Sequence, residues 1–112
     1  MDHIHDASSL VGRFVNAFNA RDLDGFLRLY APNGVLVPVP GHATQDRRAA
    51  LAHLLSFGEP MTASVKRAYT AGSVALLIVD WAVGPMRGTA VDVVRWDGGA
   101  WRYLVDNPHG VG

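Results

Sequence analysis

The sequence predicts an α+β fold in which three N-terminal helices pack on a curved, mixed but mostly antiparallel sheet. Three segments before Gly58 carry apolar residues at helical spacing, whereas from Met61 onward apolar residues alternate with the period of two that is typical of strands. Helices that precede a run of strands are characteristic of α+β proteins. With 112 residues the chain is long enough for one modest core, and we expect a single domain over residues 1–112.

Three helices are predicted, over residues 6–18, 23–30 and 46–57. In the first, Leu10, Phe14 and Phe18 recur every four residues, and Asp22 is a good N-cap for the second. Residues 35–39 are β-branched and apolar and predict a strand. Because proline lacks a backbone N–H, Pro38 and Pro40 would confine that strand to a sheet edge or cut it short. Residues 41–45 then form a loop.

Strands are predicted over residues 62–71 and 74–83, followed by a hairpin over residues 88–107 that turns at Gly98–Gly99. In this register Asp97 faces Ala100, and side chains alternate between two faces. One face carries Ala90, Asp92, Val94, Trp96, Trp101, Tyr103, Val105 and Asn107; the other carries Val91, Val93, Arg95, Arg102, Leu104 and Asp106.

Composition excludes several classes of protein. Apolar residues make up 49% of the chain, the formal net charge is zero, and there is no cysteine. Without a basic stripe we expect no nucleic-acid partner, and without cysteine there is no disulfide or thiolate chemistry. The polar start of the chain has no signal-peptide pattern, and no apolar run is long enough to span a bilayer. We therefore expect a cytoplasmic protein without a membrane partner. We also expect residues 1–6 to form a flexible tail.

Three stretches carry a resemblance to a known family. They are residues 18–36, which include Asn19-Ala20-Arg21-Asp22-Leu23, residues 91–98, Val-Asp-Val-Val-Arg-Trp-Asp-Gly, and residues 101–108. In order and spacing they resemble the SnoaL-like, nuclear transport factor 2-like superfamily, which includes ketosteroid isomerase. The resemblance implies a cystatin-like cone with an apolar pocket, and members are often dimers through the outer face of the sheet. Enzymes, polyketide-tailoring proteins and binding modules all share this fold, so the fold alone does not give the function.

The catalytic pattern of ketosteroid isomerase matches this chain only in part. Asp92 falls on the protonated Asp of that enzyme's oxyanion hole. Phe14, which has no hydroxyl, falls on its Tyr, and Pro38 falls on its carboxylate base. The resemblance therefore does not imply steroid isomerisation by that route.

Asp92 is the strongest candidate for a catalytic residue. In an apolar cone, loss of solvation disfavours the charged carboxylate, so we expect its pKa to rise and its proton to be available to a ligand carbonyl. The alternative is that Asp92 accepts hydrogen bonds from Asn107, Tyr103 or an Arg and only completes the core. Asn107 has two interpretations as well: it orients a ligand or Asp92, or it forms the turn before Pro108.

Candidate ligand-binding residues are those expected on the inner side of the cone, and aromatic residues at strand spacing are equally typical of a core. The predicted set is Phe14, Phe18, Tyr30, Leu77, Trp81, Val94, Tyr103 and Asn107. Trp81 is expected to form the wall together with Leu77 and Val79. For Tyr30 we expect a structural role, with its hydroxyl bonded to a neighbour.

The histidines suggest a general base only weakly. His42 in the loop and His53 on the third helix are candidates, and His109 could reach the rim of the cone. His3 and His5 lie in the expected tail, and no spacing indicates a metal site, so we expect neither metal nor cofactor.

The outer face of the hairpin is the expected dimer interface. Arg95 and Arg102 would lie opposite each other there, and Asp106 and Asp80 could relieve their repulsion across a two-fold interface. Val91, Val93 and Leu104 share that face.

Three hypotheses follow. The first is a protein that binds an apolar cyclic molecule next to Asp92. The second is a polyketide-tailoring or isomerase-like enzyme that uses Asp92 as its acid. The third is a non-catalytic dimeric interaction module whose cone is filled by its own side chains.

Overall fold

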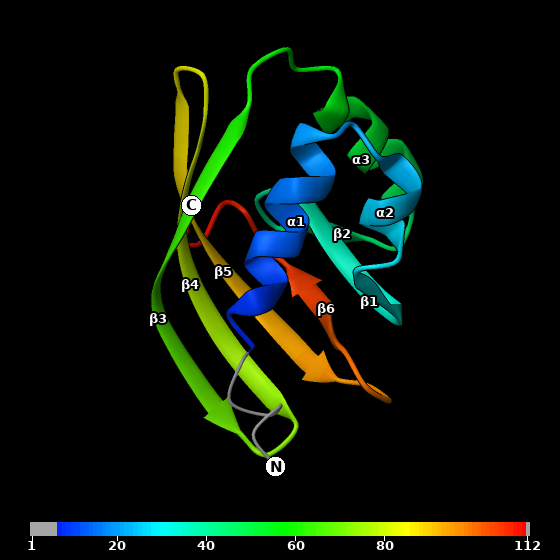
Figure 1. The fold of residues 1–112 in the computed structure, drawn as a ribbon, viewed down its shortest axis with the longest axis vertical. Coiled ribbons are helices and arrows are strands. Elements are labelled where there is room, and N and C mark those ends of the chain that lie inside the picture. The colour runs from blue at the N-terminus through cyan, green and yellow to red at the C-terminus, as the bar shows by residue number, and fades with distance from the viewer. Residues whose placement is uncertain (1–6, 112) are drawn as a thin grey trace.

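The α+β architecture is confirmed in a computed structural model that describes residues 7–111 (Figure 1). The elements are α1 (Ser9–Asn19), α2 (Leu23–Leu27), β1 (Tyr30–Val39), β2 (His42–Thr44), α3 (Arg47–Leu55), β3 (Met61–Ala71), β4 (Val74–Val83), β5 (Met86–Trp96) and β6 (Trp101–Asp106). The expected tail, with His3 and His5, lies outside the described residues.

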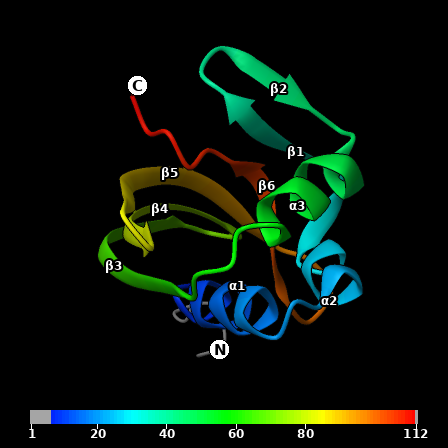
Figure 2. The ribbon, with the colours of Figure 1, turned by 90° about the horizontal axis from the view of Figure 1, so that it is seen from above.

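One mixed sheet holds all the strands, in the order β2-β1-β6-β5-β4-β3. The pair β1–β6 is parallel and the other pairs are antiparallel. Figure 2 shows the sheet curving around α1, with α2 and α3 at the end nearer β1. The largest fully buried side chains include Phe18, Phe26, Leu51 and Leu77, which join both helices and strands into one core. This arrangement is the cone that the resemblance implied.

The N-terminal half departs from the sequence prediction around β1. Asp22 caps α2 as expected, since its side chain accepts a hydrogen bond from the Gly25 N–H, but α2 ends at Leu27 and Tyr30 begins the strand. The reason is pairing with β6, where the Tyr103 N–H donates to the Leu29 carbonyl at 2.8 Å. Such a partner, distant in sequence, is invisible to local patterns.

β1 is neither short nor at the edge of the sheet. It passes through Pro38, and the three residues of β2 pair with its outer side at Leu36 and Val39. The predicted loop over residues 41–45 is therefore largely a strand. The first helix begins later than predicted, at Ser9, and ends one residue later, at Asn19, whereas the third is shorter at both ends and spans Arg47–Leu55.

The closing hairpin has the predicted register only at its tip. The predicted pairs hold from Trp96–Trp101 to Val94–Tyr103, but the next residue, Val93, pairs with Val105 instead of Leu104. One extra residue, Leu104, therefore lies in β6 as a bulge, and a bulge moves every later side chain to the opposite face. The prediction that Asp106 lies on the outer face is wrong: its side chain is turned inward and is only 5% exposed.

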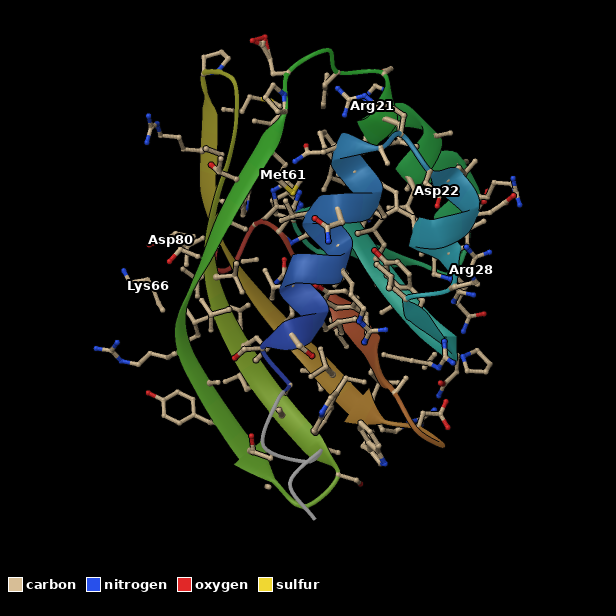
Figure 3. All side chains as sticks on the ribbon, viewed as in Figure 1. Arg21, Asp22, Arg28, Met61, Lys66 and Asp80 are labelled. Carbon is tan, nitrogen blue, oxygen red and sulfur yellow. The ribbon has the colours of Figure 1, made fainter. Side chains whose placement is uncertain are left out.

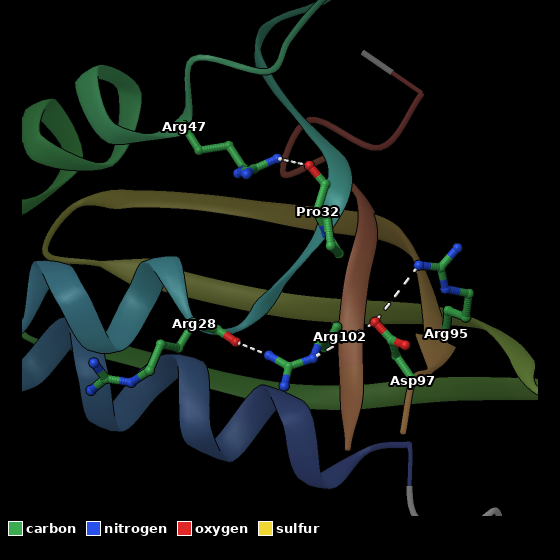
Figure 4. A network of polar contacts seen from close by, with 6 residues as sticks. All are labelled: Arg28, Pro32, Arg47, Arg95, Asp97 and Arg102. Carbon is green, nitrogen blue, oxygen red and sulfur yellow. Dashed lines mark hydrogen bonds and ion pairs between the residues drawn. The ribbon is translucent and has the colours of Figure 1, made fainter. Parts of the chain in front are cut away.

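On the outer face, the predicted pairing of Arg95 and Arg102 with Asp106 is replaced by a local one. Both guanidinium groups pair with Asp97, at 3.7 and 3.9 Å, and Arg102 also donates to the Arg28 carbonyl (Figure 4).

Asp80 is likewise engaged within its own chain. It pairs with Lys66 at 3.8 Å, on the side of β3 and β4 away from α1 (Figure 3). Val91, Val93 and Leu104 are half-buried.

Candidate ligand-binding site

A cavity of about 340 Å³ opens between the concave side of the sheet and helices α1 and α3. Its wall is largely apolar and is formed by Val11, Phe14, Leu36, Pro38, Ala50, Leu54, Phe57, Met61, Ala63, Val79, Trp81, Val83, Met86, Ala90 and Pro108. Five side chains with polar atoms complete the lining: Asp92, Tyr103, Asp106, His53 and His109. Chemistry in this cavity therefore depends on those five groups.

Asp92 and Asp106 form a carboxyl pair on the neighbouring strands β5 and β6. They are 4% and 5% exposed, and they hydrogen-bond to each other. An ionised carboxylate can only accept hydrogen bonds, so this contact requires a proton on one of the two groups. Asp92 Oδ1 also accepts from the Asn107 N–H at 2.8 Å, and Asp106 Oδ2 accepts from the Tyr30 hydroxyl.

The environment separates the pKa values of the two carboxyls. Burial, and then the negative charge of Asp106, raise the pKa of Asp92 to about 8. Burial also raises the pKa of Asp106, but the hydrogen bonds from Tyr30 and Asp92 and the charge of His109 limit the increase, to about 6. Near neutral pH the carboxyl pair therefore holds one proton and one negative charge.

A turn after β6 closes one side of the cavity. The Asn107 side chain donates to the Gly110 carbonyl at 2.8 Å and accepts from the His109 N–H at 3.3 Å. Trp81 Nε1 donates to the Pro108 carbonyl at 3.0 Å. These bonds fix the turn against β4, so the wall that Trp81 and Pro108 provide is held in place.

His109 is held against β1 by its ring. Its Nε2 lies 2.9 Å from the Pro38 carbonyl oxygen. Because a carbonyl oxygen can only accept, Nε2 carries a proton in this contact, and in the neutral ring Nδ1 then has the lone pair.

Comparison with known proteins identifies the family. The model of the SnoaL-like domain matches residues 11–104, which is most of the chain. The chain belongs to the SnoaL-like domain family. No curated protein sequence matches it.

Solved structures similar to this SnoaL-like domain share its fold at low sequence identity. A nuclear transport factor 2-like protein of unknown function from Silicibacter pomeroyi is 20% identical, with 94% of this chain and 92% of that chain covered and a TM-score of 0.75. A putative dehydratase from Streptomyces avermitilis is 14% identical, with 92% and 91% covered and a TM-score of 0.72. A putative calcium/calmodulin-dependent protein kinase type II association domain from Thiobacillus denitrificans is 18% identical, with 94% of both chains covered and a TM-score of 0.71.

In this SnoaL-like domain the predicted site residues divide into three groups. Asp92, Phe14, Trp81 and Tyr103 line the cavity. Three others do not line the cavity but are buried in the core: Phe18, Leu77 and Val94. Tyr30 and Asn107 support the carboxyl pair, Tyr30 through its hydroxyl and Asn107 through its backbone N–H.

Sequence reasoning did not place Asp106 in the site. Strict alternation of side chains along β6 assigned it to the opposite face, and only the bulge at Leu104 reverses that assignment. Among the histidines, His53 and His109 line the cavity, whereas His42 is exposed on β2.

Neither a metal site nor a membrane span is found in residues 7–111. In this part of the SnoaL-like domain, no three His, Asp or Glu side chains lie close enough to hold a metal ion. None of the helices described is both long and apolar enough to cross a bilayer.

Proposed function

We propose that this SnoaL-like domain binds a largely apolar cyclic molecule whose neutral carbonyl or hydroxyl oxygen lies at the carboxyl pair. The observation that carries this proposal is an apolar cavity of about 340 Å³ with two buried carboxyl groups in its lining. Ligand sites are typically clefts of roughly 300 to 1,000 Å³ with a few placed polar groups. An open cavity of this size favours a ligand-binding protein. An interaction module whose cone is filled by its own side chains would have no such cavity.

The charge of the carboxyl pair narrows the ligand class. With Asp106 ionised, a ligand carboxylate would be repelled by a like charge in a water-poor cavity. A ligand hydroxyl can donate to Asp106, and a ligand carbonyl can accept from the protonated oxygen of Asp92. Neutral ketones and phenols therefore fit the site better than organic acids.

Fluorescence titration tests this proposal, because Trp81 lies in the cavity wall. We expect saturable binding of a planar cyclic ketone at pH 7, and about tenfold weaker binding at pH 9, where Asp92 loses its proton. The variant Asp92→Asn retains a hydrogen-bond donor but cannot ionise, so it should bind equally at both pH values. If no ketone binds, or if both proteins lose affinity equally, the proposal fails.

A second candidate is an enzyme that moves a proton next to a carbonyl group, as in isomerisation or elimination of water. It is favoured because one carboxyl of the pair is ionised and the other protonated near neutral pH, as a general base and a general acid must be. Asp106 would be the base, since Pro38 has no side chain that could act as one. The putative dehydratase from Streptomyces avermitilis is only 14% identical, so its similarity supports the fold and not this activity.

Deuterium incorporation next to the carbonyl of a bound ketone, followed by NMR in heavy water, distinguishes this enzyme from a binding protein. The wild type should exchange that hydrogen and Asp106→Asn should not. Equal exchange by the two proteins would exclude Asp106 as the base.

We further propose that two copies pair through the outer sheet face. The apolar side chains Val91, Val93 and Leu104 are only half-buried there, which leaves apolar surface for a partner to cover. Light scattering at micromolar concentration should give the mass of a dimer, and the mass of one chain would contradict this.

A further inference from the structure

Arg21 has a backbone conformation that is unfavourable for any residue with a side chain. Its φ is 56°, and within residues 7–111 it is the only residue other than glycine with a positive φ. It follows the end of α1, where its N–H donates to the Phe18 carbonyl at 3.0 Å and the Asp22 N–H donates to the Ala17 carbonyl at 2.9 Å. This is the Schellman arrangement that ends many helices, and glycine is the usual residue at this position. An arginine here stores strain, which indicates a use for its side chain.

The guanidinium group of Arg21 joins the end of α1 to the connection between α3 and β3, residues 56–60. Its Nη1 donates to the Phe18 carbonyl at 2.8 Å, and its Nη2 donates to the carbonyls of Phe57 and Glu59 at 2.9 and 3.3 Å. Figure 3 shows Arg21 beside the chain that leads from α3 to β3. These bonds therefore fix a connection that has no regular secondary structure of its own.

The end of α1 also holds the start of β3. Asn19 Nδ2 donates to the Met61 carbonyl at 3.2 Å, and Asn19 Oδ1 accepts from the Met61 N–H at 2.8 Å. Phe57 and Met61 both line the cavity. The stretch at the end of α1 that carries the family resemblance therefore supports the cavity wall through two side chains, Asn19 and Arg21.

Phe57 lies beside the mouth of the cavity. The lining residues that are exposed to solvent, Pro38, His53 and Met86, mark this mouth. The Phe57 ring packs against His53, with centroids 5.6 Å apart and an interplanar angle of 68°. Phe57 itself is half-buried. A ligand that enters the cavity therefore meets this ring at the mouth.

We propose that Arg21 is a positioning residue for ligand binding, which holds the Phe57 ring in place at the mouth of the cavity. This inference rests on the proposed function and deepens it, because it assigns the apolar part of the ligand to Phe57. A wall that is fixed before the ligand arrives lowers the entropy cost of binding. The strained backbone at Arg21 is retained because only a side chain there can fix that wall.

The test compares Arg21→Gly with Arg21→Ala. Both variants lose the guanidinium group, but glycine adopts the positive φ without strain, whereas alanine does not. We expect the affinity for a planar cyclic ketone to fall about fivefold in both, because the ligand must then order the Phe57 ring itself. The urea midpoint of unfolding should be higher for Arg21→Gly than for Arg21→Ala. Binding should therefore follow the guanidinium group, and stability should follow the backbone.

A double-mutant cycle tests whether Arg21 acts through Phe57. Phe57→Ala should itself weaken ketone binding, since it removes apolar contact with the ligand. When Phe57→Ala is already present, Arg21→Gly should change the affinity by less than about twofold, because no ring remains to be positioned. Fluorescence of Trp81 in the cavity wall reports binding by all of these variants.

Three results would overturn the proposal. One is wild-type affinity in Arg21→Gly. Another is a much larger loss of affinity in Arg21→Ala than in Arg21→Gly, which would show that binding only follows stability. The third is an equal loss from Arg21→Gly in the presence and absence of the Phe57 ring. Failure of the wild type to bind any ketone would instead remove the proposed function together with this inference, so the two failures are distinguishable.

Discussion

Ala63→Phe is expected to abolish ligand binding while leaving the protein folded. Ala63 lies on β3 in the cavity wall, directly opposite Trp81 on β4. A phenyl ring at this position extends into the empty 340 Å³ rather than into filled core, so it competes with the ligand for the same space. We expect the affinity for a cyclic ketone to fall on the order of a hundredfold, and the free energy of unfolding to change by less than about 1 kcal/mol.

The matched control for this variant is Ala68→Phe on the same strand. Ala68 is exposed and does not line the cavity. It should therefore bind the ketone as the wild type does, measured by the same fluorescence titration. Equal affinity of Ala63→Phe and Ala68→Phe would place the ligand outside this cavity.

Asp92→Asn is expected to be increasingly more stable than the wild type as the pH rises. Both carboxyls of the pair have a folded-state pKa above the ordinary value of 3.8, at about 8 for Asp92 and about 6 for Asp106. Above pH 3.8 the folded state therefore binds more protons than the unfolded state. The stability due to these protons is fully present below the pKa that the carboxyls have in the unfolded chain. It is lost as the pH rises through about 6 and then about 8.

An asparagine at position 92 removes the part of this loss that comes from Asp92. It can still accept from the Asn107 N–H and donate to Asp106, so it imitates the protonated carboxyl. Between about pH 5 and about pH 9, its advantage in the free energy of unfolding should grow on the order of 4 kcal/mol. Urea denaturation over this range measures it.

Asp80→Asn is the control for this second prediction, because Asp80 is an exposed partner of Lys66 outside the cavity. Its difference from the wild type should stay constant over the same pH range. Parallel stability curves for Asp92→Asn and the wild type would show that Asp92 titrates as an ordinary, solvated carboxyl.

Local sequence patterns predict best those strands that pair with the next or the previous strand in the sequence. The strand predicted at 74–83 has the bounds of β4, and the tip of the closing hairpin has the predicted register. β1 is different, because its length depends on parallel pairing with β6, more than 60 residues away, at Tyr30 and Tyr103. For that reason the prediction that Tyr30 ends a helix was wrong, since Tyr30 begins β1.

The sequence predicts which side chains face the inside of the sheet, but not which of them line the cavity. Alternation along a strand identifies which side chains face inward, and it correctly assigned Asp92, Trp81 and Tyr103. It cannot distinguish a cavity wall from a core layer, so Leu77 and Val94 were assigned to the wall although both are fully buried.

The bulge at Leu104 changes the chemistry of the site. It adds Asp106 to the cavity, and with it a second carboxyl whose negative charge, after burial, raises the pKa of Asp92. Nothing in the alternation of β6 marks that residue, because the bulge is an irregularity of pairing with β5.

The measurement that tests the central claim most directly is a carbon-13 NMR titration of the Asp92 and Asp106 carboxyl carbons. Assignment by Asp92→Asn and Asp106→Asn identifies the two signals. We predict two steps, near pH 6 and near pH 8, so that at pH 7 the pair holds one proton between two buried groups. Titration of both carboxyls near pH 4, as for solvated aspartates, would contradict the carboxyl pair as the polar centre of this cavity.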